Sequence, residues 1–232
     1  MTESRRTLLD TIANVAIIGV ALLIGWSLIF GINDPGQRAR SSRLSVPNRP
    51  LTLQGASTKG SASAPIAMVE FADFECPACR TFARDVMPSL ERAYLSTGKL
   101  LFAFRHLPLD MHRNARAAAV ASICAGKQKR FWEMHDQLYA NERTQQWDFG
   151  TLAQSLSLVE TEFTSCSEDE SSRTALDKDV AMAKELGITG TPAFLIGRLQ
   201  GEEVHVMEAR TGAGKVEDVM AQVDRVLKAA GR

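Results

Sequence analysis

The pattern of apolar and polar positions divides the chain into two unequal parts. Residues 11–33 carry no charge and lie between Asp10 and Asp34. As a helix this run would extend about 34 Å, enough to cross the roughly 30 Å apolar core of a bilayer. A buried core helix is a poor alternative because every face is apolar. A cleaved signal peptide has a shorter apolar region and a small-residue cleavage site, and neither is found here. We therefore expect a transmembrane signal anchor at 11–33, with residues 1–10 on the cytoplasmic side.

Beyond residue 63 the pattern is that of a globular α/β domain. Short apolar, β-rich runs predict strands, and apolar residues at helical spacing predict helices. The expected strands are 66–73, 99–107, 193–197 and 203–209. The expected helices are 77–95, 115–125, 130–141, 149–158, 172–187 and 214–230. This order predicts β-α-β and β-β-α halves of one sheet, separated by a helical insert at about 108–187, within a domain that covers 64–232.

Between the two parts, residues 34–63 are rich in Ser, Arg, Gly and Pro, which predicts a flexible linker. The segment 50–55 could instead form a short edge strand. The linker has five Lys+Arg and one Asp, about +4, whereas 64–232 has 20 Lys+Arg and 24 Asp+Glu, about −4. These charges cancel to zero over the 232 residues. A general nucleic-acid-binding protein would be strongly basic, so we expect no nucleic-acid partner.

Candidate chemistry lies at Cys76-Pro77-Ala78-Cys79, directly after an expected strand and at the start of an expected helix. Pro77 suits the first helical turn, where its missing N–H costs nothing. At this helix N-terminus the unpaired N–H groups and the macrodipole favour a Cys76 thiolate, which is the nucleophilic form. Cys79 lies one turn later and could close a disulfide with Cys76. A structural disulfide and half of a zinc site are the alternatives, but zinc would need further ligands at tight spacing.

The chain resembles the DsbA-like thiol:disulfide oxidoreductases of the thioredoxin fold. The resemblance rests on the strand–C-x-x-C–helix order, on Gly190-Thr191-Pro192 before a strand, and on the stretches 69–79 and 124–142. It covers roughly 64–232. It implies that Cys76 attacks or is attacked, that Cys79 resolves the mixed disulfide, and that no metal or organic cofactor is needed.

The resemblance also implies roles for residues outside the motif. Pro192 would be cis and face the redox pair, and with Thr191 it would shape a groove for the substrate backbone. Glu70 stands six residues before Cys76 and would assist proton transfer at Cys79; the alternative is a surface Glu at a strand edge. Strong oxidants of the family often have His where this chain has Ala78, so we expect a milder depression of the Cys76 pKa.

Cys124 and Cys166 are the remaining cysteines. Four cysteines allow three pairings, and 124–166 is left if 76–79 is one bridge. Some DsbA-like members carry a second disulfide in the insert, so the resemblance implies a structural disulfide between Cys124 and Cys166. Two buried free thiols are the alternative.

Location and partners follow from the anchor and the cysteines together. Redox-active cysteines favour the oxidising side of a membrane. The flanking charges conflict with this, because four arginines follow the apolar run and only two precede it. We expect a single-pass protein of the inner membrane with its domain on the periplasmic side. The partners would be unfolded or reduced exported proteins, a membrane redox partner that re-oxidises the pair, and the lipid bilayer.

Three activities fit these features. The resemblance favours disulfide formation in exported proteins. A reductase or isomerase kept reduced by a membrane donor would use the same residues. A copper-handling thioredoxin-like protein would bind the ion with Cys76, Cys79 and a His, for which His106 is the candidate. For His135 we expect a packed side chain. For His106 we expect a packed or surface side chain rather than one at the active site. Asp73 and Glu75 beside the motif could oppose formation of the thiolate, but we expect them to be solvated.

Overall fold

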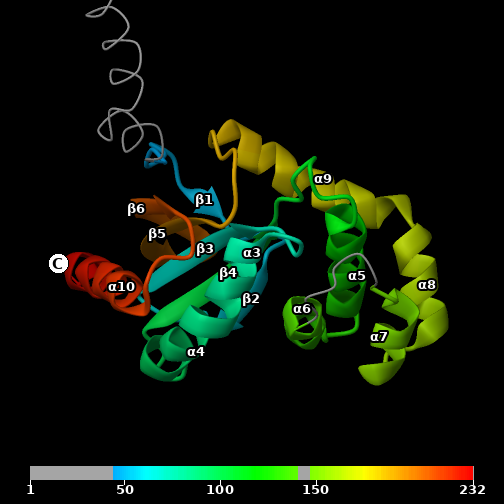
Figure 1. Cartoon of the computed structure of the whole chain (residues 1–232). Coiled ribbons are helices and arrows are strands. Elements are labelled where there is room, and N and C mark those ends of the chain that lie inside the picture. Colours follow the sequence, from blue (N-terminus) through cyan, green and yellow to red (C-terminus); the bar gives the residue numbers. More distant parts are fainter. Residues whose placement is uncertain (1–43, 141–146, 232) are drawn as a thin grey trace, which may run out of the picture. The chain divides into compact units, whose positions relative to one another are not determined.

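The computed structural model describes residues 44–140 and 147–231 (Figure 1). The strands are β1 (Leu51–Thr52), β2 (Ser57–Gly60), β3 (Ile66–Ala72), β4 (Leu100–His106), β5 (Ala193–Gln200) and β6 (Glu203–Thr211). The helices are α3 (Pro77–Thr81), α4 (Met87–Leu90), α5 (Ala115–Lys127), α6 (Phe131–Ala140), α7 (Phe149–Ser155), α8 (Glu160–Glu168), α9 (Glu170–Glu185) and α10 (Val216–Ala230). The predicted α/β order is confirmed, including the helical insert between the two halves.

The strands form one mixed sheet in the order β1-β6-β5-β3-β4-β2. β3 lies at its centre, parallel to β4 and antiparallel to β5, and all seven of its residues are buried. Alternate residues of β3 face opposite sides, as the period of two requires. Ile66 and Met68 pack toward Phe82 and the apolar face of α10, whereas Val69 packs with Leu101 and the end of α9. Helices therefore cover both faces of the sheet.

Helices α5 to α9 form the insert between β4 and β5, to one side of the sheet (Figure 1). Their core is a separate apolar cluster that includes Leu138, Ala153 and Phe163. A disulfide between Cys124 of α5 and Cys166 of α8 crosses this cluster, with the two Cα atoms 5.7 Å apart. This is the pair that the family resemblance implied.

The expected linker is wrong in its second half, because β1 and β2 belong to the sheet. β1 pairs with β6 at one edge, as the edge-strand alternative for 50–55 suggested, and β2 pairs with β4 at the other. The Arg105 guanidinium also donates to the carbonyls of Thr52 and Gln54, at 2.8 and 2.9 Å. Both strands are held through backbone groups, which apolar periodicity does not reveal. The domain thus begins before residue 64.

The expected helix 77–95 is irregular. π-Helical turns at Phe82–Val86 and Glu91–Leu95 interrupt it around α4. Pro88 lies in α4, and its missing N–H removes one bond to the preceding turn. The expected anchor at 11–33 lies outside the described residues. Among the residues that are described, no helix is long and apolar enough to span a bilayer.

Candidate active site

Cys76 and Cys79 lie where the central strand leads into a helix. β3 ends at Ala72, a short turn follows, and Cys76 is the extended residue that directly precedes α3. Pro77 occupies the first helical position, as expected. Both cysteines are free thiols in this structure. Cys76 keeps 7% of its surface accessible, whereas Cys79 has none. The sulfur that a substrate can approach is therefore that of Cys76.

The surroundings of Cys76 favour its thiolate. Its pKa is lowered to about 5, chiefly because the Cys79 thiol donates a hydrogen bond to it. The contact with Thr191 and the backbone N–H groups of Ala78 and Cys79 act in the same direction, while burial acts against it. The helix N-terminus thus supplies its unpaired N–H groups to this sulfur, as the position of the motif predicted.

Cys79 and Glu70 lie deeper and favour their neutral forms. Burial raises the pKa of the Cys79 thiol, and its hydrogen bond to Cys76 and the charge of Glu70 raise it further. Glu70 is 2% exposed, and burial followed by the charge of Cys76 raises its pKa. It lies on central strand β3, between Phe104 of β4 and Phe194 of β5. The alternative of a surface Glu at a strand edge is therefore wrong.

The loop before β5 closes the site from the other half of the sheet. The Thr191–Pro192 peptide bond is cis. Cys76 Sγ lies 3.4 Å from the Thr191 carbonyl oxygen, although 115 residues separate the two in sequence. The structure thus brings Cys76, Cys79, Glu70, Thr191 and Pro192 to one end of the sheet.

A model of the thioredoxin family matches residues 53–212. The chain belongs to the thioredoxin family. Its relatives include disulfide bond formation proteins and DsbA proteins of known structure. Two crystal structures of Wolbachia pipientis alpha-DsbA1, that of a threonine-to-valine variant and that of the protein without this substitution, have TM-scores of 0.66 and 0.64. Each is 26% identical to this chain, and each match covers 81% of this chain and 94% of the relative.

Curated relatives fall into two groups. The probable disulfide bond formation protein D of Bacillus cereus is 26% identical over 205 residues, which cover 84% of this chain and 90% of the relative. The Na(+)/H(+) antiporter NhaA 3 of Salinispora tropica is 32% identical over 157 residues, which cover 67% of this chain but 24% of the antiporter. The chain therefore spans about a quarter of the length of the antiporter relatives that it matches.

Two carboxylates beside the motif hold a loop, a role that the sequence did not suggest. Asp73 is 1% exposed, so the expectation that it is solvated is wrong. It accepts hydrogen bonds from the Leu109 N–H at 2.7 Å and the Glu75 N–H at 2.7 Å, and its carboxylate lies 2.8 Å from His112 Nδ1. Glu75 accepts the N–H of Asn114 at 2.6 Å. An Asp in a short loop between a strand and a helix often accepts hydrogen bonds from nearby backbone N–H groups. The position of Asp73 directly after a strand was therefore the signal in the sequence for this role.

The two buried histidines pack beneath the motif. Burial lowers the pKa of His106 to about 3 and also lowers the pKa of His135. Both rings contact Phe74 and Phe104, and His135 also packs edge-on against Tyr139. Both histidines are thus packed and neutral, and packing was the expectation for His135. Within residues 44–140 and 147–231, no group of three or more His, Cys, Asp or Glu side chains is arranged to hold a metal ion.

Proposed function

We propose that this chain oxidises pairs of thiols in exported polypeptides to disulfides, and that Cys76 and Cys79 are the two cysteines that exchange electrons with them. The observation that carries this proposal is the asymmetry of the two sulfurs. Cys76 is the accessible one and ionises easily, whereas Cys79 is buried and favours its neutral form.

The reaction follows from this asymmetry in two steps. A substrate thiolate attacks Sγ of Cys76 in the oxidised pair, the Cys76–Cys79 bond breaks, and Cys79 leaves with the electron pair. Cys79 takes up a proton, which the neutral Glu70 can supply. A second substrate thiolate then attacks the substrate sulfur of the mixed disulfide, and Cys76 leaves as a thiolate. The substrate gains a disulfide and loses two electrons, which the reduced pair now holds.

The direction follows from the second step. A thiol of low pKa is the better leaving group, so the mixed disulfide resolves toward substrate disulfide and free Cys76. Only the reduced form contains the stabilised thiolate, so this stabilisation makes the pair more oxidising. With Ala78 between the cysteines, in place of the His of strong oxidants, we expect a milder oxidant than the strongest members of the family.

We place the reaction on the periplasmic side of the inner membrane. The apolar run 11–33 supports the anchor, and the redox pair supports the oxidising side. The Bacillus relatives are named as disulfide bond formation proteins. Each turnover leaves the pair reduced, so a membrane partner must accept two electrons before the next one.

The test measures direction with the full-length chain. We expect the reduction potential of its Cys76–Cys79 couple to lie well above about −270 mV, the value typical of thioredoxin. We also expect the oxidised chain to restore activity to a reduced, unfolded test protein that needs disulfides, and Cys76→Ser to abolish this. A potential near that of thioredoxin, with preferential reduction of disulfides, would replace the proposal by the reductase alternative.

A further inference from the structure

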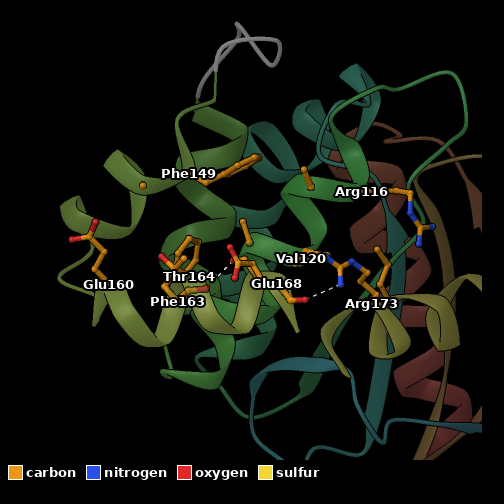
Figure 2. A pocket seen from close by; sticks show the side chains of 13 residues that line it. Arg116, Val120, Phe149, Glu160, Phe163, Thr164, Glu168 and Arg173 are labelled. Carbon is orange, nitrogen blue, oxygen red and sulfur yellow. Dashed lines mark hydrogen bonds between the residues drawn. The ribbon is translucent and has the colours of Figure 1, made fainter. Parts of the chain in front are cut away.

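The helical insert contains a cavity of about 440 Å³ that the redox chemistry does not use (Figure 2). It lies among α5, α7, α8 and α9. Its surface is mostly apolar, and the side chains that supply this surface include Val120, Ala121, Phe149, Phe163 and Leu176. A concave apolar site of this size, with a few polar groups, is typical of ligand recognition.

The walls of this cavity are held in place. The Cys124–Cys166 disulfide joins α5 to α8, which form two of the walls. Ser172, in the first turns of α9, lies beside the same bridge, with its hydroxyl oxygen 3.3 Å from Cys166 Sγ. A preformed site loses less conformational entropy on binding than one that must first be ordered.

Opposite charges lie at the two ends of the cavity. Figure 2 shows Arg116 and Arg173 at one end and Glu160 at the other, with Phe149 and Phe163 between them. Arg116 also pairs with Asp177, but both side chains are more than half exposed, so water competes strongly for this pair. The cavity is therefore complementary to an apolar group with an acidic neighbour on one side and a basic neighbour on the other.

The basic end of the cavity is connected to the redox pair. Arg116 and Ala117 lie in the first turn of α5. The residue before this helix, Asn114, donates its N–H to Glu75, which directly precedes Cys76. An extended segment of about ten residues reaches up to roughly 33 Å, so one polypeptide can engage the cysteine and the cavity together.

We propose that this cavity is a second docking site for the polypeptide substrate. It takes one large apolar side chain, such as Phe or Leu, from an unfolded segment outside the reacting cysteine, with an acidic residue toward Arg116 and a basic one toward Glu160. Unfolded chains expose such side chains and folded ones bury them, so the cavity would select chains whose thiols still need oxidation. This inference rests on the proposed function for its choice of substrate.

The kinetic test compares two peptides that share one pair of cysteines. One carries an Asp-Phe-Lys segment about ten residues away, and in the other the Phe is replaced by Ser. With the full-length oxidised chain we expect about a tenfold lower KM for the Phe peptide. Ala117 is an exposed residue that lines the cavity, and Ala117→Trp should fill it and bring the KM ratio close to one. The matched control Ala221→Trp, on the exposed face of α10, should keep the tenfold ratio. An unchanged ratio in Ala117→Trp would overturn the inference.

A binding measurement separates this inference from the proposed function. Versions of the two peptides with Ser in place of both Cys cannot react, so fluorescence anisotropy reports docking alone. We expect the Phe version to bind about tenfold more tightly. Glu160→Lys, at the acidic end of the cavity, should weaken binding of the Asp-Phe-Lys peptide and strengthen that of an otherwise identical Asp-Phe-Glu peptide. Docking without oxidation of the cysteine peptides would contradict the proposed function alone. Equal binding of both peptides, or a dimer that Ala117→Trp dissociates, would overturn the docking site.

Discussion

At the redox site, the surroundings of a side chain determine its pKa more strongly than its residue type does. Cys76 and Cys79 are three positions apart, yet hydrogen bonding lowers the pKa of the first and burial raises that of the second. Glu70 belongs to the same group, because burial also raises its pKa. The result is one sulfur that ionises easily and keeps a little accessible surface, and two more deeply buried groups that favour their neutral forms. Two predictions follow from this arrangement.

The first concerns the stability of the reduced chain. Because the folded pKa of Cys76, about 5, lies below its unfolded value, near 9, the reduced form gains stability as pH rises between these values. This gain is fully present above the unfolded pKa and is lost as pH falls through about 5. The disulfide form has no such thiolate. We expect the melting temperature of the reduced form to rise relative to that of the oxidised form from pH 5 to pH 9. The rate of Cys76 alkylation should show a midpoint near pH 5. A melting difference that is flat over this range would contradict the prediction.

The second prediction concerns Glu70. Replacing it by Gln removes the group that can protonate Cys79, and general acids typically contribute 10²–10⁴-fold. We expect Glu70→Gln to slow formation of the mixed disulfide at least tenfold in stopped-flow measurements and to change the pH dependence of that step. The chain should remain folded, because the amide is not charged. Glu217→Gln, on exposed α10, is the control and should leave the rate unchanged. If Glu70→Gln formed the mixed disulfide at an unchanged rate, Glu70 would have a packing role only and would not supply the proton.

A buried ion pair joins helix α9 to the sheet. Arg105 of β4 contacts Asp179 of α9, and both side chains are almost fully buried. The other carboxylate oxygen of Asp179 accepts the His106 N–H at 3.0 Å. Arg105 also reaches the carbonyls of Thr52 and Gln54 near β1. A single side chain thus connects the insert, the sheet and the N-terminal strands.

We expect Asp179→Ala to lower the free energy of unfolding by about 3–5 kcal/mol, because it leaves the buried Arg105 charge without a counter-ion. Asp177→Ala provides the matched control two residues earlier on α9. Its partner Arg116 is exposed, so the loss should be at most about 1 kcal/mol. Urea unfolding of both variants measures the difference. Similar losses would show that the buried pair is not what holds α9 on the sheet.

The whole molecule is expected to combine a membrane anchor with a redox domain. Residues 11–33 are uncharged over a length that spans a bilayer, and the arginines after them oppose the orientation that the redox pair favours. We expect the chain to remain with membranes after alkaline carbonate extraction. A protease added to intact spheroplasts should digest the domain. Protection of the domain there would show that the flanking charges determine the orientation.

The sequence alone determined the order of the elements and the position of the redox motif. These depend on local features: apolar periodicity defines β3 and α10, and the C-x-x-C spacing with Pro77 after a strand defines the start of α3. Family resemblance added the cis Thr191–Pro192 bond, the Cys124–Cys166 bridge and Glu70 as a site residue. Each of these is a property of one short segment or of matching motifs.

Only the tertiary structure decided what surrounds these residues. β1 and β2 pair with strands far away in sequence through backbone groups, and such pairing leaves little pattern in the side chains. The polar sequence of β2 therefore resembled a linker. Asp73 was expected to be solvated, but it is buried because the loop after β4 folds over it. Burial and the ionisation of Cys76 depend on groups from distant segments, such as Thr191, and packing alone creates the cavity in the insert. Desolvation and hydrogen bonding between distant segments arise only when the chain is folded, which is why local sequence patterns could not predict them.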